Sequence, residues 1–474
     1  MARILNARNP RTGEEDFQFE AVDSHEIAAQ TAAMRASQSV WAKLTIAERG
    51  EKLLALADSL DQHTDAIASR LEQDTGRRKI ARMEVAGASA SIRGWVAQAP
   101  TLLPDGWTDG RSNPAIRHAP QFVPFPLVGV ISPWNFPLTL SMIDTIPALL
   151  AGCSVIIKPS EVTPRFVDPV MAAIADADLR DVLTIVQGDG ATGAALMEHV
   201  DAICFTGSVA TGRKVSAKAA ERFIPAFLEL GGKDPLVILD TADLELATDA
   251  ALRGSVLSTG QACQSIERIY VQRALEDKFI ARLVEKAEAV ELNWPDITKG
   301  HIGPIIFDRQ AETLEAHIDD AVAKGATVRT GGAIEHHGGG LWLRPTVLTG
   351  VTHGMAVMRE ESFGPILPVM AFDSEDEAVA LANDTEFGLS AAVLAGTLEE
   401  AEKLGTRIDA GAVSLNDAAL TALFHEAEKH SFKASGLGGS RMGAAGFQRF
   451  LRRKALIANT GKPLPITAFA EDAG

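Results

Sequence analysis

The stretch that decides the fold is Val128–Lys158, which reads VGVISPWNFPLTLSMIDTIPALLAGCSVIIK. It belongs to an apolar run, Phe122–Ile157, which carries one charge and is as long as a membrane-spanning helix. Five prolines interrupt this run, and a proline inside a helix removes a backbone hydrogen bond and kinks the chain. The stretch therefore predicts a buried strand at 128–132, a turn, a helix and a second buried strand at 155–158, rather than a membrane helix.

Outward from this stretch, short apolar strands keep alternating with helical segments. Upstream, the capping box Thr45-Ile46-Ala47-Glu48 begins a helix that runs through Leu60, and residues 9–19 form a short hairpin. Alternating strands and helices predict parallel sheets, so we expect an α/β fold with two Rossmann-like domains. The candidate strands are 128–132, 155–158, 183–187 and 202–206 in the first domain, and 235–239, 269–272, 366–372, 392–395 and 412–415 in the second.

Composition limits the function classes. The chain has 474 residues, of which 46% are hydrophobic, and this suits two or three packed domains. Its formal net charge of −17 argues against a nucleic-acid partner, because phosphate binding needs clustered positive charge. The N-terminus shows no apolar signal segment and the three cysteines form no disulfide framework, so we expect a cytoplasmic protein. No spacing is typical of a metal site, and His336-His337 is expected in a glycine-rich surface turn.

Three residues could together carry out acyl-group chemistry. Cys263, which follows Gly260-Gln261-Ala262, offers a thiol nucleophile, whereas Cys153 and Cys204 lie beside or within apolar strands and are expected to be structural. Glu229 offers a carboxylate base, and Asn135 offers an amide donor to a developing oxyanion. Chemistry alone leaves two bland alternatives open: Asn135 could simply satisfy a tight turn, and Glu229 could be a surface residue.

The motifs Pro133-Trp134-Asn135-Phe136-Pro137 and Glu229-Leu230-Gly231-Gly232-Lys233, with Cys263 34 residues after Glu229, resemble those of the aldehyde dehydrogenase superfamily. The resemblance runs over nearly the whole chain, from residue 9 to residue 436. It implies that the Cys263 thiolate attacks an aldehyde to form a thiohemiacetal. It also implies that Asn135 and the Cys263 backbone N–H hold the alkoxide, and that Glu229 activates water to hydrolyse the thioester. Members that acylate coenzyme A typically lack this glutamate, so a free acid is the expected product.

The resemblance also implies a nicotinamide dinucleotide as the oxidant. The G-x-G-x-x-G match at 188–193 is expected to be a turn on the adenine side, and the pyrophosphate is expected at the helix start beside Gly207-Ser208. A carboxylate at Glu161 would accept hydrogen bonds from the ribose and repel a 2′-phosphate, which favours NAD without excluding NADP. The residues implied in cofactor binding are Trp134, Lys158, Glu161, Gly207, Ser208, Glu361 and Phe363.

The superfamily's plan implies a projecting hairpin that joins a homodimer or homotetramer. This hairpin would fall near Gly106–Val123 and pair with a C-terminal strand near Lys454–Thr460, although the sequence alone predicts a loop at Arg111–Ala119. The implied division is an NAD-binding domain at 1–105 and 124–231, a catalytic domain at 232–434, and oligomerisation segments at 106–123 and 450–474.

One segment departs from the superfamily. Its common motif, Pro-Phe-Gly-Gly-x-Lys-x-Ser-Gly-x-Gly-Arg, matches this chain at Lys433, Ser435, Gly436 and Gly438. The glycine pair is replaced by His430-Ser431, Gly439 stands where the arginine is expected, and Arg441 follows two positions later. The geometry of this segment, which borders the substrate mouth in the superfamily, is therefore not predicted. Nearby polar residues expected on the loop surface are His425, Glu426 and Lys429.

The residues expected around the substrate are mostly apolar. Because no arginine pair is evident for a carboxylate, we expect an uncharged aliphatic or aromatic aldehyde. An acid semialdehyde such as succinate semialdehyde is the alternative, and a non-catalytic structural or binding protein on this fold is another; a cysteine hydrolase would need a histidine that no motif supplies. Arg268 is expected to order its loop or pair with Glu267. The pocket residues are Phe136, Leu140, Gln264 and Phe424, with Ile143, Ala262 and Leu423.

Overall fold

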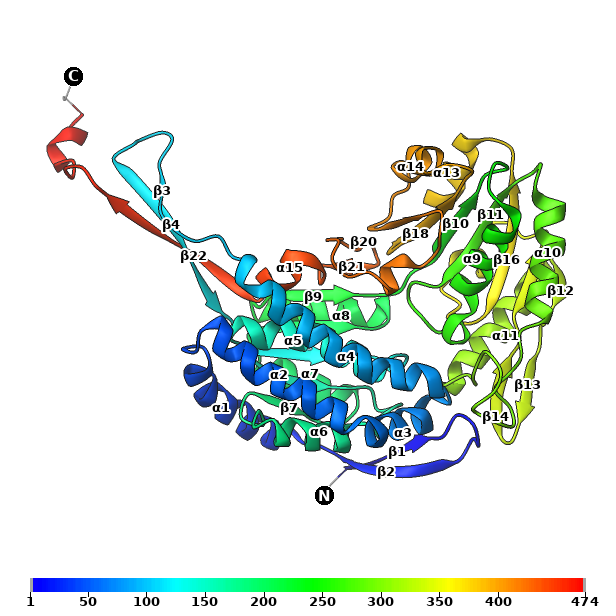
Figure 1. Ribbon diagram of the computed structural model, residues 1–474, viewed down its shortest axis with the longest axis horizontal. Helices are drawn as coiled ribbons and strands as arrows, with labels where there is room; N and C mark the ends of the chain where they lie inside the picture. The colour runs from blue at the N-terminus through cyan, green and yellow to red at the C-terminus, as the bar shows by residue number, and fades with distance from the viewer. Residues whose placement is uncertain (1–2, 472–474) are drawn as a thin grey trace.

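The structure is a computed structural model that describes residues 3–471, and it consists of two lobes and a projecting arm (Figure 1). The first lobe contains a six-stranded sheet, the second a seven-stranded sheet, and the arm a three-stranded sheet. Within each large sheet, the inner strands run parallel and helices pack against them. The predicted fold class, two Rossmann-like α/β units with a projecting hairpin, is confirmed.

The first lobe is built around β5, which lies between β8 and β6 in the order β21-β9-β8-β5-β6-β7. Its strands are β5 (Leu127–Ile131), β6 (Ser154–Lys158), β7 (Leu183–Ile185), β8 (Ala202–Thr206), β9 (Ala226–Glu229) and the antiparallel edge strand β21 (Gly436–Leu437). Its helices are α1 (Ser24–Trp41), α2 (Ile46–Gln62), α3 (Thr64–Thr75), α4 (Arg78–Gln98), α5 (Pro137–Ala151), α6 (Val167–Asp176), α7 (Gly190–Met197), α8 (Val209–Glu221) and α15 (Gly443–Gln448). A hairpin of β1 (Arg3–Arg8) and β2 (Glu15–Ala21) precedes them, as predicted.

The stretch quoted first folds as predicted, as β5, a turn, α5 and β6. Pro137 begins α5, where its missing N–H has no helical partner, and Gly152 ends the helix in the left-handed region at φ +105°. Asp144 is buried inside this helix and accepts hydrogen bonds from Arg441 at 2.9 Å and from Arg449. Within residues 3–471 no helix is long and apolar enough to cross a membrane.

The second lobe has the strand order β12-β15-β16-β11-β10-β18-β19, parallel except for β12. Its strands are β10 (Asp234–Ile238), β11 (Ile266–Gln272), β12 (Thr327–Thr330), β15 (Thr346–Thr349), β16 (Ile366–Phe372), β18 (Ala391–Leu394) and β19 (Val413–Leu415). Its helices are α9 (Leu244–Val256), α10 (Glu276–Glu288), α11 (Asp308–Ala323), α12 (Ala356–Arg359), α13 (Glu375–Asn383) and α14 (Leu398–Gly405). Two small antiparallel pairs complete it: β13 (Ile334–His337) with β14 (Gly340–Leu343), and β17 (Phe387–Gly388) with β20 (Phe432–Lys433).

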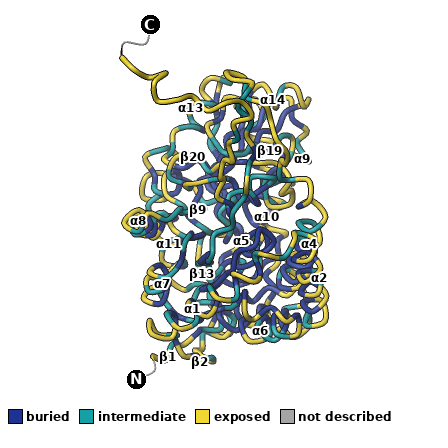
Figure 2. The backbone as a smooth tube through the Cα atoms, turned by 90° about the vertical axis from the view of Figure 1, so that its left-hand side faces the viewer, coloured by how far each residue is buried: buried dark blue, intermediate teal, exposed yellow. Residues whose placement is uncertain are grey.

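Two sequence-based expectations about local structure were wrong. His336 and His337 lie in strand β13 rather than in a turn, and His337 stacks on Trp294 with ring centroids 6.2 Å apart. The expected loop at 111–119 ends in strand: β4 (Ile116–Pro124) pairs with β3 (Thr108–Asp109) and with β22 (Leu451–Asn459), which begins before the predicted residue 454. The polar sequence of β4 does not by itself indicate a strand, and pairing with β3 and β22 supplies its backbone hydrogen bonds. The segment after β22 is exposed (Figure 2).

The two large sheets face each other through the ends of their strands, the carboxyl ends in the first lobe and the amino ends in the second. In the first lobe β5, β6, β8 and β9 end at the same level, because Ile131 pairs with Lys158 and Thr206 pairs with Glu229. In the second lobe β10, β11 and β16 begin at the matching level, and the chain passes from the end of β9 to the start of β10 through Leu230–Lys233. The loops at the carboxyl ends of one sheet therefore face the loops at the amino ends of the other.

Replacing Asp144 with alanine should destabilise the first lobe by about 3–5 kcal/mol, because two buried arginines would lose their carboxylate. Urea unfolding followed by tryptophan fluorescence would measure this loss. Asp58→Ala is the matched control, since Asp58 is exposed and pairs with Arg93 at the surface, where little change is expected. Equal unfolding midpoints for Asp144→Ala and wild type would contradict the assignment.

Candidate active site

Cys263 lies in the short loop between α9 and β11, at the amino end of the second sheet. The loop is strained: Ser258 and Thr259 adopt left-handed φ values of +60° and +61°. Thr259 holds this conformation by donating from Oγ1 to Gly303 O at 3.0 Å and accepting from Gly303 N at 3.1 Å. Such strain in non-glycine residues is typical of functional loops, where the surrounding structure fixes the geometry.

Asn135 comes from the facing loop, directly after β5, and is buried. Its Nδ2 donates to Gln261 O at 3.1 Å, two residues before Cys263. The buried guanidinium of Arg77 donates to Asn135 O and, at 3.5 Å, to Ser258 O. The amide and the cysteine loop are therefore held together by hydrogen bonds that cross between the lobes.

Glu229 is the last residue of β9 and is largely buried. Its Oε2 accepts a hydrogen bond from Ser431 Oγ at 2.8 Å and lies 3.8 Å from Lys429 Nζ. Three residues further on, a Cβ added to Gly232 would lie 2.6 Å from the carbonyl oxygen of Cys263. The backbone after Glu229 thus packs directly against the cysteine, and only glycine leaves room for this approach.

The surroundings of Cys263 favour its neutral thiol. Burial, followed by the carboxylates of Glu361 and Glu229, raises its pKa to about 12, although the cations of Lys429 and Arg441 act in the opposite direction. A thiolate must therefore form in company with a proton acceptor during the reaction. Burial also raises the pKa of the other two thiols, Cys153 and Cys204, which lie in the core and face no loop of the site.

Comparison with known proteins identifies the family. Residues 2–456 match the model of the aldehyde dehydrogenase family. The chain belongs to the aldehyde dehydrogenase family. It is 37% identical to the "Putative succinate-semialdehyde dehydrogenase [NADP(+)]" of Mycolicibacterium smegmatis, over 98% of this chain and 92% of that protein. It is 34% identical to betaine aldehyde dehydrogenase 1 of Rhizobium meliloti, over 87% and 86%.

Solved structures of the family superpose on the whole chain. The Anabaena variabilis protein called "Putative Aldehyde Dehydrogenase PutA" is 51% identical, with a TM-score of 0.95 over 98% of this chain and 99% of that one. A betaine aldehyde dehydrogenase from Staphylococcus aureus in complex with NAD+ is 30% identical, with a TM-score of 0.91 over 97% and 93%. The family predicted from the motifs is thereby confirmed, and so is the two-domain fold.

Most of the residues predicted to hold the cofactor lie in the loops at the carboxyl ends of the strands of the first sheet. The chain moves from β5 to β6 and β7, then returns to the other side of β5 with β8 and β9, so the strand order reverses between β5 and β8. Such a reversal marks the ligand crevice of open α/β sheets. Trp134 follows β5, and Gly207 and Ser208 follow β8.

The donors in this crevice suit an anionic dinucleotide. Ser208 caps α8 by accepting from Thr211 N at 3.3 Å, and the next two amides, at Val209 and Ala210, have no partner within the helix. Gly207 N donates instead to Glu229 O at 3.2 Å, so this hydrogen bond joins the turn after β8 to the end of β9. On the other side of β5, buried Lys158 donates to Gly188 O at 2.8 Å and lies 3.3 Å from the half-exposed Glu161.

Glu361 and Phe363 belong to a turn before β16 that faces the same crevice. Phe363 has a left-handed φ of +55° and its ring meets that of Trp134 edge-on, with centroids 5.4 Å apart. Glu361 accepts from Gly232 N at 3.0 Å. Burial and the neighbouring Glu267 raise the pKa of Glu361 to about 8.

Sequence reasoning missed the pair that holds this turn. Lys233 Nζ lies 2.6 Å from Glu267 Oε2, and both side chains are buried. The same carboxylate accepts the backbone N–H groups of Ser362 at 2.7 Å and Phe363 at 2.8 Å. Pairing of Arg268 with Glu267 was wrong: Arg268 donates to backbone oxygens of Lys233 and Ala382. Only the adjacency of Lys233 to the Gly-Gly motif could have signalled this role.

Of the residues predicted to line the substrate pocket, some are buried or half-buried and others are exposed. Phe136 lies under Arg77, whose guanidinium carbon is 5.0 Å from the ring centroid, and Leu140 is buried. Gln264 accepts a hydrogen bond from Thr421 at 2.5 Å, which joins the cysteine loop to the segment that carries exposed Phe424. Lys429 was expected at the loop surface, but it is buried because its loop folds back toward Glu229.

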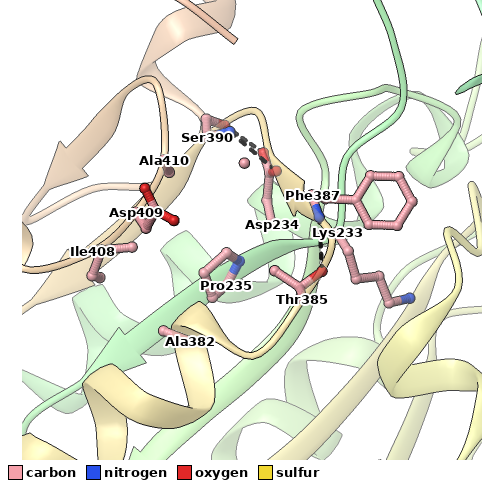
Figure 3. Close-up of a pocket in the computed structure, with 11 residues that line it drawn as sticks. Lys233, Asp234, Pro235, Ala382, Thr385, Phe387, Ser390, Ile408, Asp409 and Ala410 are labelled. Carbon is pink, nitrogen blue, oxygen red and sulfur yellow. Dashed lines mark hydrogen bonds between the residues drawn. The ribbon is translucent and has the colours of Figure 1, made fainter. Parts of the chain in front are cut away.

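A small cavity next to Lys233 is not part of this site. It encloses about 10 Å³, room for a single water, and Figure 3 shows Asp234 directed at Ser390 while Lys233 points the other way. Asp234 accepts hydrogen bonds from Ser390 N at 3.2 Å and from Ser390 Oγ, and burial raises its pKa to about 7. These hydrogen bonds anchor the start of β10, and the cavity is too small for an organic ligand.

Replacing Gly232 with alanine should lower aldehyde turnover by about 100-fold, because the added methyl group would displace the carbonyl of Cys263 and misplace the thiol. Steady-state kinetics, together with thermal unfolding, would separate this effect from loss of fold. Gly94→Ala is the matched control, because a Cβ there meets no atom within 4 Å. Wild-type turnover in Gly232→Ala would show that this close approach is not needed.

Proposed function

We propose that this enzyme oxidises an uncharged aldehyde to a carboxylic acid with NAD, using Cys263 as nucleophile, Asn135 as oxyanion donor and Glu229 as base. Membership of the aldehyde dehydrogenase family supports the reaction class. The observation that carries the residue assignment is the link between facing loops, in which Asn135 Nδ2 reaches Gln261 O at 3.1 Å, beside Cys263. The first lobe would hold the cofactor and the second lobe would carry the nucleophile.

Acylation begins with loss of the Cys263 proton. We assign Glu229 to accept it, since its carboxylate acts electrostatically on this thiol and the backbone at Gly232, three residues after it, packs against Cys263. The thiolate then attacks the aldehyde carbon and forms a C–S bond, while Asn135 Nδ2 and the Cys263 N–H stabilise the alkoxide. The buried site strengthens these hydrogen bonds, because no bulk water competes with them.

The oxidation needs a nicotinamide dinucleotide beside the thiohemiacetal. NAD, when bound, accepts the hydride that leaves the thiohemiacetal carbon as the thioester forms. The chain's own residues would orient it: the α8 amides beside Ser208 hold the pyrophosphate, Lys158 and Glu161 hold the adenosine ribose, and Glu361 holds the second ribose. Trp134 and Phe363 flank the ring. Glu161 favours NAD because its carboxylate would repel a 2′-phosphate.

Hydrolysis completes the cycle. Glu229, after passing its first proton to solvent, takes a proton from water, and the water oxygen bonds to the thioester carbon. The C–S bond then breaks to return the thiolate, which regains its proton from Glu229. The same oxyanion donors serve this second tetrahedral intermediate. The free carboxylic acid then leaves through the mouth near Phe424.

An uncharged aldehyde is favoured because, among the residues that the structure describes, the two arginines beside the site are already engaged. Arg441 is bound to Asp144 and Thr206, and Arg77 is bound to backbone oxygens. The mouth is apolar, with Leu423, Phe424 and Leu437 each more than half exposed. The Mycolicibacterium smegmatis relative keeps an acid semialdehyde as the second candidate substrate, and a panel of matched aldehydes would decide between the two.

Variants of the three catalytic residues should fail in different ways. Cys263→Ala should form no NADH from any aldehyde while still binding NAD, whereas Asn135→Ala should lower turnover by about 10²–10³-fold. Glu229→Gln should release about one NADH per site in a burst slower than that of wild type, because the thiol loses its proton acceptor, and should then stall as the thioester. Absorbance at the NADH band, in stopped flow, measures all three. Cys204→Ala is the control that keeps turnover, and turnover in Cys263→Ala would exclude the thiol mechanism.

We further propose that the arm of β3, β4 and β22 joins copies of the chain into a homodimer or homotetramer. The arm projects from the first lobe (Figure 1) and presents Ile457, 70% exposed, on β22. Three more exposed apolar residues follow it in the tail: Leu464, Ile466 and Phe469. Apolar surface of this extent suits burial against a partner. Three free cysteines suit a reducing compartment such as the cytoplasm.

Ile457→Asp should reduce the mass measured by sedimentation velocity to that of the monomer, because a charge would enter the contact between arms. Ile4→Asp, at another exposed position on β1, is the control and should leave the mass unchanged. An unchanged mass for Ile457→Asp would remove the arm from the interface.

A further inference from the structure

Two residues that touch Glu229 stand where the family motif has other residues. Alignment at Lys433 and Ser435 places Lys429 at the phenylalanine of that motif and Ser431 at its second glycine. Neither of those motif residues could donate a hydrogen bond or a charge from its side chain. The polar environment of the base is therefore a feature of this chain's own sequence.

Both residues act on the same carboxylate oxygen. Ser431 Oγ donates to Glu229 Oε2 at 2.8 Å, and Lys429 Nζ lies 3.8 Å from it. No side chain or backbone group within residues 3–471 donates to Oε1. One oxygen is thus fixed, and the other stays free to accept a proton from water.

The Lys429 ammonium is buried without a hydrogen bond. Its side chain is 4% exposed, and Nζ has no hydrogen-bond partner among the described residues. Burying such a cation is costly unless nearby negative charge balances it. The acidic groups that face it are Glu229 and Asp234, together with Cys263 when that thiol ionises. The loop cannot release it easily, because Lys429 N donates to Ser440 Oγ at 3.1 Å.

We propose that Lys429 is a positioning residue which, with Ser431, fixes the Glu229 carboxylate as the base for thioester hydrolysis and supplies positive charge to the Cys263 thiolate. This inference rests on the proposed function. During hydrolysis, Glu229 Oε1 takes the water proton, the C–O bond forms and the C–S bond breaks. The electron pair of that bond returns to sulfur as a thiolate, and the ammonium of Lys429 stabilises it.

Substrate-free thiol titration tests the charge directly. The rate of Cys263 alkylation by iodoacetamide, followed by mass spectrometry across pH, reports the thiolate fraction. Besides Lys429, the groups that act on this thiol are Glu361, Glu229 and Arg441. Lys429→Met removes a cation that lowers the pKa of Cys263, so at each pH below that pKa its alkylation should be slower than that of wild type, whereas Lys429→Arg should keep the wild-type rate. Equal alkylation rates for wild type and Lys429→Met would overturn the inference.

Stopped-flow kinetics tests the base. Lys429→Met and Ser431→Gly should keep the first burst of NADH but slow the steady state by about 10-fold or more, since hydrolysis would become limiting. Thermal unfolding of each variant identifies any loss of fold, and Lys429→Arg should recover most of the steady-state rate. If Lys429→Met instead raises KM only for carboxylate-bearing aldehydes, Lys429 binds substrate and the inference is overturned. If wild type shows the thiol titration but forms no NADH, the proposed function fails while the charge effect stands.

Discussion

The buried ion pair between Lys233 and Glu267 fixes the geometry on which the site depends. Lys233 ends the four-residue passage from β9 to β10, and Glu267 lies at the start of β11. The same carboxylate accepts the N–H groups of Ser362 and Phe363, so one buried charge positions the turn beside the predicted nicotinamide face as well. Loss of either partner would leave an uncompensated charge in the interior, which explains why an ion pair of this kind is retained at a functional centre.

Charges of both signs act on the Cys263 thiol. Glu361 and Glu229 supply negative charge, and Lys429 and Arg441 supply the opposing positive charge. Burial raises the pKa of Glu361 to about 8 and that of Asp234 to about 7, so both can hold a proton near neutral pH. A centre of this composition favours the neutral thiol until a proton acceptor is aligned with it.

Much of the fold follows from patterns that the sequence displays locally. The buried strands, the proline at the start of α5 and the capping box of α2 each depend on a few neighbouring residues, and the structure has them within one or two positions for most strands. Strand β4 was predicted only through the family resemblance, because its own polar residues are ordered by pairing with β22, more than three hundred residues away. His336 and His337 were misplaced for the same reason, since β13 depends on its partner β14.

The candidate site divides in a similar way. Cys263, Glu229 and Asn135 stand in motifs with chemically informative residue types, and their roles remain predictions that rest on proximity. Lys429 could not have been assigned, because its segment reads as a polar loop and its burial results from the long-range return of the chain to Glu229. Arg77 was equally hidden: nothing in its helix start indicates that it binds the carbonyl oxygens of Asn135 and Ser258.

The chain crosses between the lobes twice in one place, outward at Leu230–Lys233 and back between β20 and β21. The two crossings are joined, because Leu230 N donates to Ser435 O at 2.8 Å and β21 pairs with the end of β9. A single connecting segment would let one lobe rotate freely against the other, whereas two hydrogen-bonded segments restrict that rotation. The paired crossing therefore resists a twist of one lobe against the other, and with it any slide of Glu229 away from Cys263.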